Sequence, residues 1–289
     1  MTTLNAHVAL VPDSPSITLA KVSPVAAAIQ KQVTRDFGPI WQVHATVDAF
    51  DKLEAVPVDY WPIIIRDDIK EPGAAGYHTD NHGQPFSLVQ ADPGWELTAS
   101  HEALEMLADP FGNRTTAGPP PPKAPAPVSG FSRVSYLVEV CDPCEADQFS
   151  YEVNGVQLSD FITPHYYDPN GSTGVLYSCR GSIKAPHTVL EGGYVSFGNP
   201  VDNHWYQIIV VNGKQQVRDL GIIKTTKGKS LRELVDRMVR EKLKSQHYRT
   251  MAPRSITAAT SMKGSAPSPL ANSSAARAKS LRKFVEDLD

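Results

Sequence analysis

Length, composition and charge exclude several classes of protein before any motif is considered. The chain has 289 residues, of which 41% are hydrophobic and 20% are charged, and its formal net charge is −3. This composition is ordinary for a globular protein, and the length suits two domains of roughly 150 residues each. The small net charge predicts neither a nucleic-acid groove nor attraction to an anionic membrane surface, so we expect no nucleic-acid or membrane partner.

The sequence contains no segment that predicts a membrane span or a secretion signal. No run approaches the roughly 18 apolar residues that a transmembrane helix needs. Residues 1–15 lack the basic patch and the continuous apolar run of a signal peptide. We therefore expect a cytoplasmic protein, with packaging into a virion as the alternative.

The three cysteines, Cys141, Cys144 and Cys179, are too few and odd in number for a disulfide framework. Cys141 and Cys144 form a single C-x-x-C pair, whereas a structural zinc site needs two further ligands at ordered spacing. Ordinary semi-buried thiols are therefore favoured over a zinc knuckle or a redox pair.

Residues 1–117 predict a mixed arrangement of helices and strands. An apolar stripe favours a helix over residues 23–37, which Gly38-Pro39 would end. Three strands follow, at residues 42–50, 61–66 and 86–90. A turn-rich loop at residues 71–85 separates the last two strands.

A second helix is predicted over residues 95–109, because its apolar residues keep helical spacing. Thr98 or Ser100 could serve as its N-cap, and Asp109-Pro110 would end it. The expected order in this part of the chain is helix, three strands and helix.

Residues 118–130 contain four consecutive prolines and mark a boundary. Such a run favours extended polyproline geometry and cannot pair in the middle of a sheet. An exposed loop or linker is favoured over a ligand for a proline-reading domain.

Residues 131–228 predict a β-rich part. The strand-like runs are residues 136–140, 151–158, 175–178, 194–197 and 205–211. Asn154-Gly155 and Asn212-Gly213 predict hairpin turns, because both central residues of such turns take positive φ.

An amphipathic helix is predicted next, within residues 229–245, where apolar residues from Leu231 to Leu243 form one stripe. The remaining residues, 246–289, are rich in Ser, Ala and Pro and mildly basic, which predicts a flexible tail with at most a short helix at residues 279–288. A solvated tail is favoured over an arm that binds an assembly partner.

The candidate site lies in the second predicted helix. His101 and Glu105 are four residues apart, so on a helix they project from one face and can bind one metal ion together. Glu102 lies beside His101, where a carboxylate suits a base acting on water, as in H-E-x-x-H enzymes. Here the motif is H-E-x-x-E. Carboxylates bind zinc, but the added negative charge also makes manganese or calcium plausible.

A third ligand must come from outside this turn of helix. Glu139 is the better candidate, since a charged residue within an apolar strand is costly unless it is paired or bound to metal. Asp109, at the helix end, is the other candidate for a ligand or for a supporting residue. Asp142 could support a ligand by accepting a hydrogen bond.

The remaining histidines carry less weight. His78, in the polar segment 76–83, could contact substrate or stabilise an oxyanion, giving it a catalytic role. A turn held by side-chain hydrogen bonds explains Asp80 and Asn81 without any ligand. The three histidines among aromatic and proline residues are interpreted as packing or surface residues: His165, His187 and His204.

The order of helix, strands and H-E-x-x-E helix resembles the zincin metallopeptidases. Residues 100–110 (SHEALEMLADP), 138–143 (VEVCDP) and 158–161 (LSDF) look like those of a bacterial and phage-encoded group with this motif, and the resemblance covers residues 41–211. It implies His101 and Glu105 as ligands, Glu102 as the base and Glu139 as the third ligand. The missing second histidine departs from the main zincin pattern.

These observations lead to one expected function and one alternative. We expect an α+β, zincin-like domain completed by the β-rich part, acting as a zinc-dependent peptidase or hydrolase on a protein or peptide substrate. The alternative is a catalytically inactive zincin-like structural or interaction protein, such as a component of a phage virion.

Overall fold

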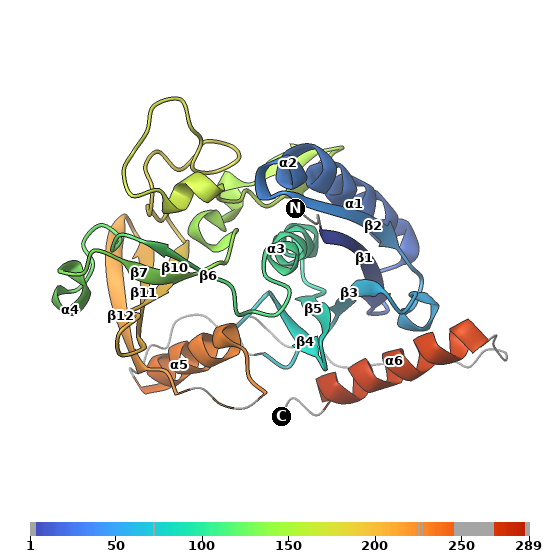
Figure 1. Cartoon of the computed structure of the whole chain (residues 1–289). Helices are drawn as coiled ribbons and strands as arrows, with labels where there is room; N and C mark the ends of the chain where they lie inside the picture. Colours follow the sequence, from blue (N-terminus) through green and yellow to red (C-terminus); the bar gives the residue numbers. More distant parts are fainter. Residues whose placement is uncertain (1–3, 72, 225, 227, 246–268, 287–289) are drawn as a thin grey trace. The chain divides into compact units, whose positions relative to one another are not determined.

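The computed structural model describes residues 4–71, 73–224, 226, 228–245 and 269–286, whose helices and strands are labelled in Figure 1. They form two compact units. The first takes in Met1–Pro110, Glu152–Leu158 and Thr250–Asp289 so far as these ranges are described, and the second takes in Phe111–Tyr151 and Ser159–Arg249. The α+β class is confirmed. The division falls after Pro110, whereas the sequence suggested a boundary after residue 117.

The first unit is built on a five-stranded sheet with the order β2-β1-β3-β5-β4. Four strands are parallel, and β4 runs antiparallel to β5 at the edge. The strands are β1 (Leu4–Asp13), β2 (Val43–Ala49), β3 (Tyr60–Arg66), β4 (Gly76–Asn81) and β5 (Gln84–Gln90). The three strands predicted in this part are confirmed as β2, β3 and β5.

Two strands of this sheet were not predicted. β1 is flanked by β2 and β3, and its residues Val8 to Val11 are buried on both faces, so it lacks the alternation that marks a half-exposed strand. β4 lies within the segment that we expected to be a loop. It is joined to β5 by His82 and Gly83, whose φ angles of 53° and 80° suit a tight hairpin turn.

The first helix is longer than predicted. It begins as α1 (Leu19–Gln32), continues as a π-helical segment (Val33–Phe37) and ends as α2 (Gly38–Trp41). Gly38 does not end it: an added Cβ there would lie 2.6 Å from the carbonyl oxygen of Val43. The glycine therefore permits close packing against the start of β2, and the helix ends where Gln42 takes a φ of 57°.

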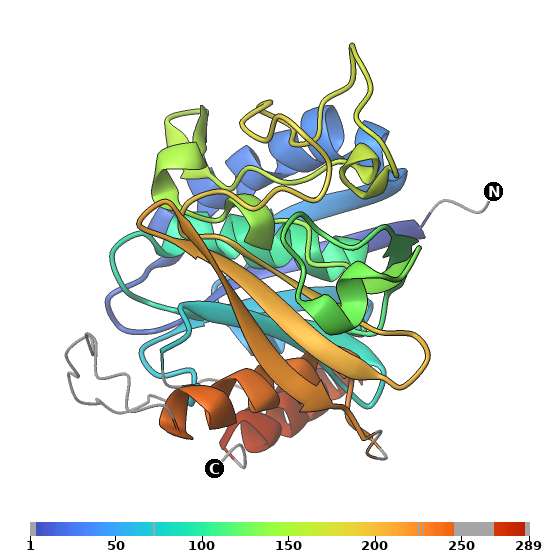
Figure 2. The same ribbon diagram turned by 90° about the vertical axis from the view of Figure 1, so that its left-hand side faces the viewer.

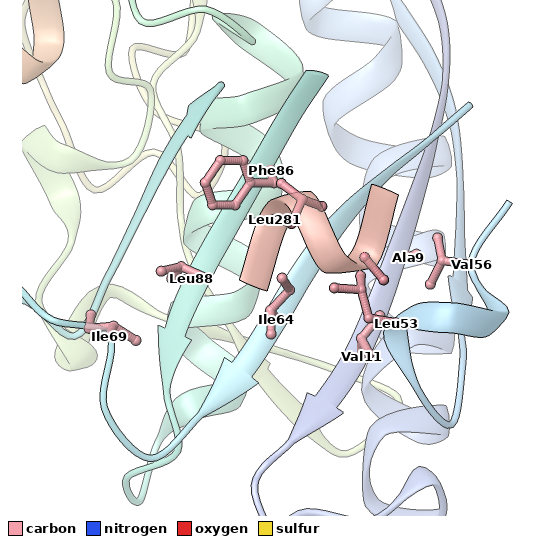
Figure 3. Packing of buried hydrophobic residues seen from close by; sticks show 10 residues of the cluster. Ala9, Val11, Leu53, Val56, Ile64, Ile69, Phe86, Leu88 and Leu281 are labelled. Atoms are coloured by element: carbon pink, nitrogen blue, oxygen red, sulfur yellow. The ribbon is translucent and has the colours of Figure 1, made fainter. Parts of the chain in front are cut away.

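The two faces of this sheet carry different helices (Figure 1). The helices α1 and α3 (Trp95–Ala108) pack on one face. On the other face, Leu281 of α6 (Pro269–Glu286) packs against Ile64, Phe86 and Leu88 in a fully apolar cluster (Figure 3). Residues 269–286 thus differ from the expected solvated tail, while residues 246–268 lie outside the described part of the chain.

Short elements complete the first unit. The strands β8 (Tyr151–Val153) and β9 (Val156–Leu158) form a hairpin whose turn residues, Asn154 and Gly155, have φ angles of 53° and 81°. The predicted hairpin is therefore confirmed. A 3-10 turn, Leu53–Ala55, packs against α6.

The second unit is built on an antiparallel sheet with the order β12-β11-β10-β7-β6. Its strands are β6 (Thr115–Gly118), β7 (Val134–Leu137), β10 (Tyr194–Gly198), β11 (His204–Val211) and β12 (Lys214–Ile222). The long β11–β12 hairpin, orange in Figure 2, turns at Asn212 and Gly213 with φ angles of 53° and 69°, as predicted. Three 3-10 turns lie in its loops: Asp142–Cys144, Asp147–Phe149 and Pro164–Tyr167.

Two strand predictions in this unit are wrong. The run at residues 136–140 ends as a strand at Leu137, so Glu139 lies just beyond β7. Residues 175–178 form only an isolated bridge, in which Ser178 pairs with Ile162. The residues beyond β7, Val138 and Val140, are buried in a loop, whereas the run at 175–178 is only partly buried and Leu176 is exposed.

The proline-rich segment is a partly exposed loop within the second unit, so it is a loop of that unit and not a linker between the two units. The Tyr136 hydroxyl donates to the carbonyl of Pro119 over 2.6 Å, and the Gln215 amide donates to that of Pro122 over 2.7 Å. A short helix follows, α4 (Ala126–Ser129), in which Val128 is fully buried.

The amphipathic helix is confirmed as α5 (Leu231–Ser245), whose apolar face packs with Trp205 and Leu220. Ser230 and Glu233 form a reciprocal capping box at its start, which was not predicted. Among the described residues, no helix combines the length and apolarity needed to cross a bilayer.

Candidate metal centre

The helix α3 carries the H-E-x-x-E motif and is fixed against α1. It begins at Trp95, after Gly94 at a φ of 92°, so the prediction of Thr98 or Ser100 as N-cap is wrong. Ser100 instead lies inside the helix, where its buried hydroxyl donates to the Gln32 side-chain carbonyl over 2.8 Å. This buried bond sets the rotation of α3 one residue before the motif.

The motif carboxylates are buried. The Glu105 side chain is 0% exposed, the Glu102 side chain 3% and the His101 side chain 13%. Carboxylates are rarely buried without compensating partners, because desolvation disfavours their charged form. The cluster therefore meets solvent on its His101 side and keeps Glu102 and Glu105 inside.

His78 joins this cluster from strand β4. It pairs in register with Ser87 of β5, and directly opposite residues of an antiparallel pair point to the same face of the sheet. Ser87 donates to the sulfur of Met106 on α3, so this face is the one that α3 covers. The hairpin register therefore aims His78 at the helix, and its side chain is fully buried.

Three pairs of donor atoms from these four side chains lie within 4 Å of each other. His101 Nε2 is 3.3 Å from Glu105 Oε1. His78 Nδ1 is 3.5 Å from Glu102 Oε2 and 3.8 Å from Glu105 Oε2. Charge-assisted hydrogen bonds between nitrogen and carboxylate oxygen are shorter, about 2.7–2.9 Å.

A metal ion fits this spacing. Zinc binds imidazole nitrogen and carboxylate oxygen at about 2.0–2.2 Å, so two ligands of a tetrahedral ion lie roughly 3.3 Å apart. The donor atoms of His101 and Glu105 already have this separation. Those of His78 and Glu105 are 3.8 Å apart, so a small side-chain movement would bring them to it.

Asp109 takes part in the site through its main chain. Its carbonyl oxygen lies 3.0 Å from His78 Nε2, at the point where α3 ends. The sequence suggested that the Asp109 side chain would be a ligand or would support one. The structure gives its backbone a role in positioning the His78 ring.

Gly76 is a further part of the site that we did not predict. A Cβ at this position would lie 2.6 Å from Thr98 Cγ2 and 3.0 Å from Glu102 Cγ and Oε1. Strand β4 can therefore approach α3 only because residue 76 has no side chain. The sequence signal for this role was a glycine next to the polar segment 77–82. Gln32, which accepts the hydrogen bond from Ser100, was also not predicted, and its signal was a polar residue on an apolar helical stripe.

Glu139 and Asp142, the other predicted site residues, belong to the second unit. Both are buried. Glu139 Oε2 lies 3.4 Å from Nε of Arg232 on α5, and both side chains are less than 10% exposed. Asp142 opens the 3-10 turn Asp142–Cys144. The ion pair with Arg232 is a reason for burying Glu139 that requires no metal.

The remaining histidines have structural surroundings, as we interpreted them. His165 and His204 lie at 2.7 Å and 2.6 Å from the carboxylates of Asp168 and Asp219 near the surface. His187 is buried and stacks on Tyr136, with ring centroids 5.2 Å apart. Burial lowers the pKa of His187 to about 4, which keeps its ring neutral.

The segment around Asp80 also fits the structural interpretation. The Asp80 carboxylate accepts the backbone N–H of Gly83 over 2.7 Å and thereby closes the β4–β5 turn. Cys141, Cys144 and Cys179 form no disulfide within the described part of the chain, and the first two are buried.

Comparison of the chain with family models, with curated proteins and with solved structures gave no match.

Proposed function

We propose that this protein is a metal-dependent hydrolase whose ion is held by His101 and Glu105, with a protein or peptide as substrate. The observation that carries the proposal is the separation of 3.3 Å between His101 Nε2 and Glu105 Oε1 on one face of α3. This distance suits two ligands of one ion better than it suits a hydrogen bond to a carboxylate. The partial exposure of His101 gives the ion a route from solvent.

Zinc is the ion that we expect. Calcium prefers six to eight oxygen ligands, and the imidazoles of the cluster disfavour it. Manganese accepts mixed nitrogen and oxygen ligands and is the closer alternative. A bound zinc ion supplies Lewis acidity, which makes water a stronger acid and a carbonyl carbon a better electrophile.

Glu102 is the proposed general base. Its carboxylate is buried beside the proposed ligands, next to His101 on the same helix, where it can accept a proton from water. In peptide hydrolysis Glu102 would take a proton from the attacking water while oxygen adds to the carbonyl carbon. It would then deliver that proton to the leaving amine as the C–N bond breaks.

The test separates metal binding from chemistry. Glu102→Gln should keep the wild-type metal content by elemental analysis but lose cleavage of a mixed fluorogenic peptide library by at least about 100-fold, the usual contribution of a general base. His101→Ala should lose the metal as well. Glu96→Gln, on the first turn of the same helix, is the matched control and should change neither measurement.

Two results would contradict this function. Full activity in Glu102→Gln would exclude the mechanism, and a wild-type protein without transition metal would exclude the site. In that case we favour a catalytically inactive zincin-like structural or interaction protein, such as a virion component. The specific observation on its side is Glu105 itself, which stands where the zincin pattern has a second histidine.

A further inference from the structure

We infer that the surface beneath α6 is a docking site for a basic amphipathic helix, which α6 of the same chain fills reversibly and which α6 of a second copy can also fill. This inference is independent of the metal centre, and α6 and its docking site both belong to the first unit. We call this site the α6 surface. It consists of the buried apolar residues that α6 covers: Ala9, Val11, Leu53, Val56, Ile64, Ile69, Phe86 and Leu88.

The α6 surface is built by elements that are held together without α6. The strands β1, β3 and β5 pair with one another, and α1 and α3 cover the opposite face of their sheet. To this cluster α6 adds the buried side chains of Ala278 and Leu281 (Figure 3) and the partly buried ring of Phe284, which meets Phe86 edge-on with centroids 5.8 Å apart. Without α6 the sheet would present a contiguous apolar patch, which is a feature of interaction sites.

The polar contacts of α6 are made by side chains and fit a basic helix. Arg282 donates to Asp13 Oδ1 over 2.7 Å and to Glu54 Oε1 over 3.3 Å. Arg277 donates to the main-chain carbonyl of Pro57 over 2.6 Å. The Arg282, Asp13 and Glu54 side chains are all partly exposed, and such ion pairs contribute specificity but little stability. The helix is therefore matched to this surface in charge without being locked to it.

The attachment of α6 decides which copy fills the site. Residues 246–268 stand between α5 and α6 in the chain. Covalent attachment gives α6 an effective concentration on the order of mM at its own sheet, so the helix of the same chain fills the site first. The contacts themselves do not depend on chain connectivity, so a second copy offers the same ones whenever the site is vacated.

A variant that releases α6 tests the site directly. Leu281→Asp places a charge in the apolar cluster and should release α6 from the full-length protein, whereas Lys279→Asp introduces the same side chain at an exposed position and should leave α6 docked. A fluorescent peptide of residues 269–286 should bind Leu281→Asp in an anisotropy titration. It should bind the wild type and Lys279→Asp at least about tenfold more weakly, because the attached helix competes with it. The same peptide carrying Leu281→Asp should bind none of them.

Hydrogen–deuterium exchange adds a measurement that needs no variant. In the wild type, the backbone amides of α6 should exchange at least about tenfold faster than those of α3, because a reversibly docked helix opens without unfolding of the sheet. In Leu281→Asp, α6 should lose its protection while β3 and β5 keep theirs. Equal protection of α6 and α3 in the wild type would make α6 an integral part of the core and overturn the inference.

Three results with Leu281→Asp would overturn it as well. Loss of protection throughout the sheet would show that the sheet requires α6. Retained protection of α6 would show that the apolar contact does not hold the helix. A released α6 without binding of the peptide would show that the surface is not a docking site.

Discussion

Two buried histidines show how surroundings decide what a histidine can do. His187, in the second unit, lies among the rings of Tyr136 and Tyr166, and burial lowers its pKa to about 4. His78, in the first unit, is just as buried but faces two carboxylates while its other nitrogen is held by a carbonyl. Apolar surroundings make a neutral packing residue, whereas converging carboxylates make a place for a cation.

The comparison extends to the buried carboxylates. Glu105 has imidazole neighbours, which offer lone pairs to a metal, and Glu139 lies beside the guanidinium of Arg232, which offers N–H donors and a permanent positive charge. The positive charge of Arg232 offsets part of the cost of burying the Glu139 carboxylate.

The largest expected effect concerns this ion pair. Arg232→Met should lower the free energy of unfolding by about 3 kcal/mol, because it removes one partner of a buried pair and leaves the Glu139 charge poorly compensated. Zinc content should stay at the wild-type level. Urea denaturation and elemental analysis measure the two quantities, with Arg133→Met as an exposed control in the same unit. Loss of zinc in this variant would make Glu139 a candidate ligand again and would contradict the difference drawn between Glu105 and Glu139.

A smaller effect is expected where strand β4 meets α3. Gly76→Ala should destabilise the protein by about 1–3 kcal/mol, since its new Cβ would overlap Thr98 and press on Glu102. Zinc affinity should fall with it, because the new methyl group presses on Glu102 and Thr98 of the helix that carries His101 and Glu105. Gly130→Ala, which meets open space at a negative φ, should change neither quantity. Unchanged zinc affinity in Gly76→Ala would show that the site does not depend on this close approach.

The last effect is absent at neutral pH and should appear only on acidification, as a pH dependence of His187. Its pKa of about 4 in the folded protein lies below the ordinary value of 6.5. The unfolded chain therefore binds more protons between these values, and stability is retained above pH 6.5 and falls as the pH drops toward 4. The contribution of one such group is at most about 1.4 kcal/mol per pH unit.

The measurement is a comparison of slopes. Denaturation between pH 7 and pH 4 should show a flatter loss of stability in His187→Asn than in the wild type, and asparagine tolerates the φ of 57° at this position. Equal slopes would mean that His187 does not stay neutral in the folded protein, and the contrast with His78 would lose its basis.

Many elements of the first unit could be predicted from the local pattern of apolar and polar residues. The strands β2, β3 and β5 and the helix α3 have strong alternation, apolar runs or helical spacing, and all were predicted. β1 was missed because it is buried on both faces, and β4 because its Thr79-Asp80-Asn81 segment reads as a loop. The packing of α6 on the sheet could not be predicted, because it joins residues that are distant in the chain.

The candidate site likewise has a part that local sequence predicts and a part that it does not. The sequence by itself determined that His101, Glu102 and Glu105 lie within one turn and a half of a helix, because helix geometry depends only on local spacing. Only the tertiary structure decided that His78 joins them and that Glu139 lies beside Arg232. Strand register, the close approach at Gly76 and the carbonyl of Asp109 bring these groups together, and each is a contact between segments that no local pattern records.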